Sequence, residues 1–125
     1  MPSYVIDSNI LIYHLKEEPA ITQFLEDLLT ENDHAFVSAI TRTEVLAAPV
    51  MQEGEDQRII ILLNKFHTIP VDLYIADTAA RIRRMYRLTL GDSIIAATAF
   101  MFNSTLVTRN VRDFKKVPEL QILPL

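Results

Sequence analysis

Four acidic side chains have types and places that could do chemistry: Asp7, Glu44, Asp92 and Asp113. Three of them lie in polar segments that follow expected strands, and Asp92 opens an expected buried helix. In open α/β sheets, the crevice that binds ligands lies beyond the carboxyl ends of the strands. If the strands that precede these acids are neighbours in one sheet, their carboxylates converge on a single pocket. Such a pocket could bind a cation and act on a substrate.

A converging set of carboxylates has a distinct chemistry. Like charges within about 4–6 Å of each other raise each other's pKa, so the cluster does not stay ionised without help. Mg²⁺ and Mn²⁺ relieve this repulsion, because hard divalent cations prefer oxygen ligands. A metal held in this way activates a water nucleophile and stabilises the charge of an in-line phosphoryl displacement. The acids therefore predict metal-dependent phosphodiester hydrolysis, provided that they converge.

Each acid also has a purely structural interpretation. Asp7 could cap the helix that follows it, and the pattern Thr41-Arg42-Thr43-Glu44 fits a capping box. Asp92 precedes a long apolar run and could be the N-cap of that helix, whereas Asp113 lies in a charged stretch typical of a solvated loop. An acid at a helix N-terminus can still turn one oxygen toward a metal. Capping and metal binding are therefore compatible, and four acids at corresponding places are stronger evidence than one.

The elements that must position these acids alternate between strands and helices. Hydrophobic periodicity and turn residues predict strands at 4–6, 35–38, 67–71, 105–107 and 120–123. They predict helices at 10–13, 19–29, 41 to near 49, 55–66, 72–86 and 94–102. The last helix is apolar nearly all round, so we expect it to be buried, with its Phe100–Phe102 end in the core or in a dimer contact. This alternation is typical of an α/β domain with a mainly parallel sheet of four to five strands, and we expect one domain over residues 1–125.

Composition excludes several other kinds of chemistry. The 125 residues contain no cysteine, which rules out disulfides, thiolate zinc sites and cysteine nucleophiles. With two glycines, the chain has neither a Walker A loop nor a dinucleotide-binding fingerprint. The N-terminus lacks the basic region of a signal peptide, and the longest apolar run, Ile94–Phe102, is about half a membrane span. We therefore expect a soluble cytoplasmic protein with no membrane partner.

The net charge of −4 conceals an uneven distribution. Residues 1–80 carry 13 acids and 4 bases, whereas residues 81–116 carry 8 bases and 2 acids. The two acids of the basic segment are Asp92 and Asp113. An acidic average argues against a nucleic-acid partner, but the basic segment argues for one.

Four ordered motifs resemble those of PIN-domain ribonucleases: residues 4–12, 41–46, 91–99 and 106–114. Together they span most of the chain, and the set most resembles the VapC-type toxins of bacterial type II toxin–antitoxin pairs. The resemblance implies a three-layer α/β/α PIN-like fold and a Mg²⁺- or Mn²⁺-dependent endoribonuclease. It also implies a homodimer and a cognate antitoxin protein whose tail enters the active site, often with an arginine.

The resemblance also implies roles for individual residues. Asp7, Glu44 and Asp92 correspond to the core metal-binding acids of the family. Many relatives have Asp where this chain has Asn110, whereas others pair Asn there with an acid three residues later. This chain follows the second pattern, which assigns Asp113 to the fourth or second-metal position and Asn110 to a neutral orienting role. Behind these acids, two residues would hold waters or carboxylates: Asn9 and Thr108.

Arginines of the basic segment are candidates for RNA contact, because positive charge supplies most of the affinity that does not depend on sequence. Arg109 and Arg112 lie beside the proposed metal site. A second group recurs at helical spacing, with Arg83 offset from it: Arg81, Arg84 and Arg87. The second group could equally be an ordinary solvated helix face. Two other functions remain open at this point, a non-catalytic RNA- or protein-binding module and a DNA-directed metal nuclease.

Overall fold

The computed structural model describes residues 2–31, 34–48 and 53–125. Its centre is one sheet with the order β3-β2-β1-β4-β5. All four neighbouring pairs are parallel, which confirms the predicted parallel sheet. The strands are β1 (Ser3–Ile6), β2 (His34–Ser38), β3 (His67–Ile69), β4 (Thr105–Thr108) and β5 (Ile122–Pro124). Because the strands are parallel, the carboxyl ends of β1, β2 and β4 lie at the same edge of the sheet.

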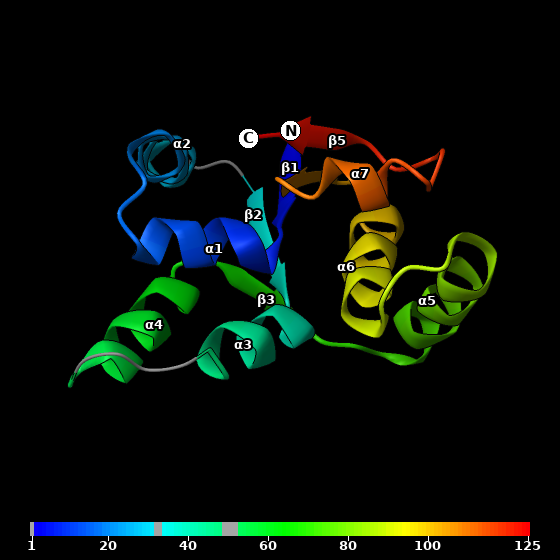
Figure 1. Cartoon of the computed structure of the whole chain (residues 1–125), viewed down its shortest axis with the longest axis horizontal. Helices are drawn as coiled ribbons and strands as arrows, with labels where there is room; N and C mark the ends of the chain where they lie inside the picture. The colour runs from blue at the N-terminus through cyan, green and yellow to red at the C-terminus, as the bar shows by residue number, and fades with distance from the viewer. Residues whose placement is uncertain (1, 32–33, 49–52) are drawn as a thin grey trace.

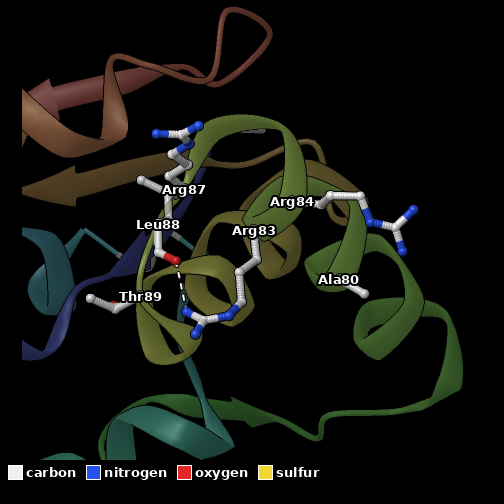
Figure 2. A pocket seen from close by; sticks show the side chains of 6 residues that line it. All are labelled: Ala80, Arg83, Arg84, Arg87, Leu88 and Thr89. Carbon is white, nitrogen blue, oxygen red and sulfur yellow. Dashed lines mark hydrogen bonds between the residues drawn. The ribbon is translucent and has the colours of Figure 1, made fainter.

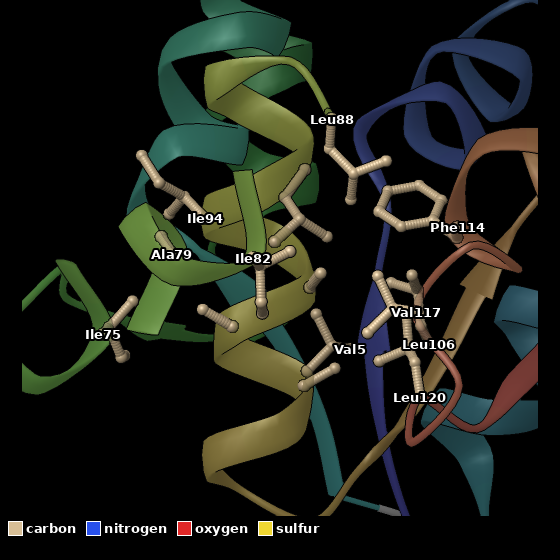
Figure 3. Packing of buried hydrophobic residues seen from close by; sticks show 14 of the residues in the cluster. Val5, Ile75, Ala79, Ile82, Leu88, Ile94, Leu106, Phe114, Val117 and Leu120 are labelled. Carbon is tan, nitrogen blue, oxygen red and sulfur yellow. The ribbon is translucent and has the colours of Figure 1, made fainter. Parts of the chain in front are cut away.

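Helices cover both faces of this sheet (Figure 1). They are α1 (Ser8–Leu15), α2 (Pro19–Thr30), α3 (Ala39–Leu46), α4 (Glu55–Leu63), α5 (Leu73–Tyr86), α6 (Leu90–Met101) and α7 (Val111–Phe114). Successive residues of a strand point to opposite faces. Val5 accordingly joins the core under α5 and α6, while Ile6 joins the core under α1, α2 and α4. Figure 3 shows the first of these cores, in which Leu88 and Phe114 lie beside each other at one end of the cluster. The three-layer α/β/α arrangement is thus present.

Helix starts differ from the sequence prediction at two places that matter for the site. The side chain of Ser38 accepts a hydrogen bond from the backbone N–H of Ile40, so α3 begins at Ala39 and not at Thr41. Thr89 caps α6 by accepting a hydrogen bond from the N–H of Asp92. The capping-box interpretation of Glu44 and the N-cap interpretation of Asp92 are therefore wrong. Both acids lie inside helices that other residues cap, which leaves their carboxylates free for another task.

Other predicted boundaries shift by a few residues. The helix predicted to reach Phe66 ends at Leu63, the strand predicted to reach Val71 ends at Ile69, and the last strand begins at Ile122. The predicted helix end near Pro49 lies outside the described residues.

The helix α6 is buried only from Ser93 to Ala99. Phe100, Met101 and Phe102 are 44–50% exposed, so the prediction that they belong to the core is wrong. An apolar run predicts that a helix is buried, but not where the neighbours that bury it end. Within the described part of the chain, no helix combines the length and apolar character that crossing a membrane requires.

Candidate active site

Asp7 lies at the end of β1 and is fixed on both of its carboxylate oxygens. Its backbone N–H continues the β1–β4 pairing by donating to the Val107 carbonyl at 3.0 Å. The Ser8 N–H donates to Oδ1 at 2.7 Å, and the Thr108 hydroxyl donates to Oδ2 at 2.7 Å. The residue is only 4% exposed. The sheet therefore presents one buried, immobilised carboxylate at its carboxyl edge, as the sequence predicted for Asp7 and for Thr108 behind it.

Glu44 reaches the same region from α3. The Ser8 hydroxyl donates to its Oε1 at 2.6 Å, which links the acid to the residue after Asp7. Its other oxygen lies against the start of α6, where a Cβ added to Gly91 would come within 2.8 Å of Glu44 Oε2. A glycine at position 91 thus allows α3 and α6 to bring their acids together. Neither contact was predicted from the sequence, although a glycine in a chain with only two of them was a usable signal at position 91.

Asp92 and Asp113 are joined through an amide. The Asn110 Nδ2 donates to Asp92 Oδ2 at 3.3 Å, and the Asn110 side chain lies close enough to Asp113 to lower the pKa of that acid. Asp113 has two basic neighbours as well, since Arg112 Nε and Lys116 Nζ each lie 3.7 Å from its Oδ1. Asn110 therefore lies beside two acids, and the neutral orienting role that the family resemblance implies for it stays a prediction.

The electrostatics divide the acids into two kinds. Burial, together with the charges of Asp92 and Glu44, raises the pKa of Asp7 to about 6, although the bonds from Thr108 and Ser8 act in the opposite direction. Burial and the charge of Glu44 also raise the pKa of Asp92. The hydrogen bond from Asn110, with Lys116 and Arg112 nearby, lowers the pKa of Asp113. Asp7 and Asp92 are short of positive charge, whereas Asp113 already has it.

These residues fit a hydrated divalent cation better than a bare one. Among residues 2–31, 34–48 and 53–125, no three His, Asp or Glu side chains could hold a metal ion by themselves. Mg²⁺ usually keeps several waters and takes only one or two carboxylates, so Asp7 and Asp92 are a sufficient direct set. In the same described ranges, the buried Oδ1 of Asn9 lacks a hydrogen-bond partner. The donors are all oxygen, and two of the acids have a raised pKa, mainly because they are buried and in part because other acids lie near them.

Arg109 has a different environment from the one that RNA contact would need. Its guanidinium forms an ion pair with Glu18, and its Nε donates to the Leu125 carbonyl at 2.9 Å. It also lies 4.5 Å from the centre of the Tyr13 ring. Arg109 therefore ties β4 to the α1–α2 connection, between two residues that orient the acids, Thr108 and Asn110. Its partner Glu18 is 91 positions away in sequence, and no sequence pattern pointed to it.

The arginines of α5 do not form the single face that their spacing predicted. Arg83, Arg84 and Arg87 line one pocket together with Leu88 and Thr89 (Figure 2). Arg81 lines a different pocket, whose wall also includes Glu119. Arg112 is exposed beside Asp113.

Comparison with known proteins agrees with this fold. The family model described as "PIN domain" matches residues 4–120. The chain belongs to the PIN-domain family. It is 32% identical to Ribonuclease VapC19 of Mycobacterium tuberculosis, with 94% of this chain and 96% of that protein covered. It is 29% identical to Ribonuclease VapC1 of Haemophilus influenzae, with 94% of each covered.

A solved toxin–antitoxin complex from Klebsiella pneumoniae contains a chain of similar structure. The TM-score is 0.83 and the sequence identity 31%, over 97% of this chain and 96% of that one. The family resemblance inferred from the four motifs is therefore confirmed.

Proposed function

We propose that this protein is a divalent-metal-dependent endoribonuclease and the toxin of a type II toxin–antitoxin pair. The observation that carries the proposal is the field around Asp7. Its carboxylate is buried and accepts a hydrogen bond on each oxygen. Burial and the negative charges of Asp92 and Glu44 raise its pKa, and no basic side chain among the described residues opposes them. Capping of α1 accounts for one oxygen of Asp7, whereas a divalent cation would also offset the charges of Asp92 and Glu44 beside it. The names of the curated relatives, ribonucleases VapC, supply the substrate class.

The residues have separable tasks in this proposal. Asp7 and Asp92 would hold the ion directly, Glu44 would hold it through bound water, and Asp113 would stand at the weaker or second position. When bound, Mg²⁺ or Mn²⁺ supplies Lewis acidity toward water and positive charge toward the phosphodiester. Thr108 and Ser8 keep the carboxylates of Asp7 and Glu44 in one orientation by donating hydroxyl protons to them.

Partners and location follow from the same relationship. Because the similar Klebsiella pneumoniae structure is a toxin–antitoxin complex, we propose that a cognate antitoxin binds this chain. Homodimerisation and a cytoplasmic location are also part of the proposal, and a cysteine-free composition suits that reducing compartment.

The decisive experiment compares acid variants in cleavage and in metal binding. Asp7→Asn and Asp92→Asn should each lower Mg²⁺- or Mn²⁺-dependent RNA cleavage by at least about 100-fold, the upper end of what changes behind a metal cost. Asp113→Asn should lose less, because Arg112 and Lys116 already balance its charge. Asp77→Asn, the same change at an exposed position of α5, is the matched control and should cleave like wild type.

Metal binding is measured on the same proteins without RNA. A concentration of Mg²⁺ near 100 times Kd should stabilise the wild-type fold by about 2.7 kcal/mol, and Asp92→Asn should lose this gain. Wild-type cleavage by both Asp7→Asn and Asp92→Asn would refute the site. A folded wild type that binds neither Mg²⁺ nor Mn²⁺ would indicate a non-catalytic binding module. Cleavage of a matched DNA but not of RNA would indicate a DNA-directed nuclease.

A further inference from the structure

The C-terminal end of α5 forms a cationic pocket of about 640 Å³ that the acid centre does not use. Six residues line this pocket, and half of them are arginines. They are Ala80, Arg83, Arg84, Arg87, Leu88 and Thr89. The helix C-terminus contributes roughly half a negative charge, which three guanidinium groups outweigh. The pocket is therefore positive overall and suited to an anion.

The three arginines of this pocket have no acidic partner in the described residues. The ion pairs found there belong to Arg109, Arg112 and Lys116. No Asp or Glu lines the pocket, whereas Glu119 lines the neighbouring pocket around Arg81. Arg83, Arg84 and Arg87 are all exposed. Their charges are therefore available to a ligand from solution, whereas the pocket that Arg81 lines also contains an acid, Glu119.

The directions of the side chains indicate what kind of anion fits. Arg83 Nη1 donates to the Leu88 carbonyl at 2.8 Å, which fixes this guanidinium under the Leu88–Thr89 segment. Figure 2 shows Arg83 turned toward that carbonyl, while Arg84 and Arg87 extend in other directions from the helix end. Guanidinium groups spread in this way do not close around one small ion. They match a ligand that carries several phosphates along its length.

The pocket is joined to the acid centre through one helix cap. Thr89 lines the pocket, and its Oγ1 accepts the backbone N–H of Asp92 at 3.2 Å. Thr89 and Asp92 are thus separated by about one turn of α6, and a turn rises about 5.4 Å. A strand whose reacting phosphate lies at Asp92 would have a neighbouring part of its backbone beside the arginines.

We propose that Arg83, Arg84 and Arg87 form a subsite for the backbone phosphates of an RNA strand that flank the cleaved bond. This inference rests on the proposed ribonuclease function and adds a strand path to it. Arg84 and Arg87 contact phosphates, and Arg83 contributes charge while it holds the Leu88 carbonyl. Arg81, which the helical spacing grouped with Arg84, lies outside this path.

The test measures RNA binding without cleavage, in EDTA, with a single-stranded RNA oligomer and a salt series. For single strands, log K falls with log salt by about 0.7 for each phosphate neutralised. The double variant Arg84→Gln/Arg87→Gln should therefore reduce the slope by about 1.4. Over the range from 1 M to 0.1 M salt, the wild type should then gain about 25-fold more affinity than the variant does. Arg83 is left intact because its side chain supports the Leu88 carbonyl.

Two single variants serve as comparisons. Arg58→Gln removes the same charge from an exposed position of α4 and should leave the slope unchanged. Arg81→Gln should change it less than Arg84→Gln does, because Glu119 shares the pocket of Arg81. With Mg²⁺ present, the double variant should raise KM for RNA and keep kcat, because a contact remote from the reacting atoms removes uniform binding.

Several outcomes would overturn this inference. An unchanged salt slope in the double variant would refute it while wild-type cleavage kept the ribonuclease proposal intact. Equal losses in Arg81→Gln and Arg84→Gln would show that charge on the helix, and not the pocket, attracts RNA. If the double variant lost binding of inorganic phosphate but not of RNA, the pocket would be a small-anion site. If it lost binding of polyglutamate but not of RNA, the pocket would be a protein-binding site. A wild type that neither binds nor cleaves RNA would refute both proposals together.

Discussion

The acid centre (Asp7, Glu44 and Asp92) and the arginine pocket lie on either side of Thr89. In the part of the chain that the structure describes, the acid centre lacks neutralising positive charge, and the arginine pocket lacks neutralising negative charge. Asp7 and Asp92 are partly or wholly buried, and burial raises the pKa of both. The charges of Asp92 and Glu44 add to this effect at Asp7, and the charges of Glu44 and Asp113 add to it at Asp92. Arg84 and Arg87 are exposed and form no ion pair within the described residues. If the sequence were selected for stability alone, we would expect the arginines to form ion pairs with the nearby acids. Their separation leaves one region open to a cation and the other to a phosphate.

The uneven charge of the sequence has a structural meaning in this comparison. The basic segment holds 8 of the 12 Lys and Arg residues, but the structure assigns them to different tasks. Arg109 ties β4 to Glu18 and Tyr13, while Arg112 and Lys116 neutralise Asp113. Only part of the positive charge is therefore left for a ligand, and the arginine pocket holds most of that part.

Among changes outside the acids themselves, the largest expected effect on cleavage comes from closing the space between α3 and the start of α6. In Gly91→Ala, the new methyl group would lie 2.8 Å from Glu44 Oε2, so the carboxylate must swing away. Alanine is favoured over glycine in a helix by roughly 0.5–1 kcal/mol, so the melting temperature should stay the same or rise. Cleavage of RNA should fall by about 10- to 100-fold, as it does when residues behind a metal are displaced.

A double-mutant cycle identifies the route of the Gly91 effect. If Gly91→Ala acts by displacing Glu44, then adding it to Glu44→Gln should cause little further loss, because the two changes affect one contact. Additive losses would show that the glycine serves something else. A drop in melting temperature large enough to unfold the protein at the assay temperature would also contradict the prediction.

The next effect separates stability from activity at Asp7. The pKa of Asp7 is about 6 in the folded chain against 3.8 for the ordinary group, so ionisation costs the metal-free fold about 3 kcal/mol. Replacing Asp7 by Asn removes this cost, but it also weakens the hydrogen bond from Thr108, which costs about 1 kcal/mol. Asp7→Asn should therefore stabilise the metal-free protein by about 2 kcal/mol at pH 7.5, as measured by urea unfolding in EDTA.

The sign of this effect fixes its pH range. A carboxyl that is easier to protonate when folded contributes stability below pH 3.8 and loses it as the pH rises through about 6. The gap between Asp7→Asn and wild type should thus be large at pH 7.5 and small at pH 4. Asp77→Asn, at an exposed position, should show no such pH-dependent gap. A gap for Asp7→Asn that stays constant between pH 4 and pH 7.5 would be inconsistent with a buried, repelled carboxylate.

The sequence was sufficient for the parallel sheet and for placing acids near its carboxyl edge, because both depend on local patterns. That the four acids act together on one metal ion stays a prediction. Short β-prone runs followed by polar residues predicted β1, β2 and β4, and the shared carboxyl edge then follows from parallel pairing. Helix starts were less accessible, since Ser38 and Thr89 compete with acids that are equally good caps. Sequence chemistry alone does not decide between two adequate capping residues.

Contacts between distant segments were not accessible from the sequence. The pairing of Arg109 with Glu18 depends on how β4 lies beside the start of α2, which no local spacing records. Arg81 and Arg84 satisfy helical spacing, yet the elements around α5 place them in different pockets. Periodicity describes one helix by itself, whereas a binding surface depends on what its neighbours cover.

The smallest expected effect compares the backbone and the side chain of Arg87. Its φ of 58° and ψ of 39° lie in the left-handed region that glycine adopts without strain. Arg87→Gly relieves about 1 kcal/mol of strain and loses a similar amount in helix-end charge and chain entropy, so stability should change by less than about 0.5 kcal/mol. The salt slope of RNA binding should nevertheless fall by about 0.7.

Arg87→Lys separates charge from backbone conformation, because it retains both the cation and the strain. If the arginine pocket binds phosphates, Arg87→Lys should keep a salt slope close to that of wild type while Arg87→Gly loses one contact. Equal slopes for all three proteins would remove Arg87 from the strand path and leave Arg84 as its only tested contact. If replacing Arg87 leaves the fold equally stable but weakens RNA binding, then this residue serves RNA binding and not stability. The contrast between the acid centre and the arginine pocket would then be demonstrated at a single residue.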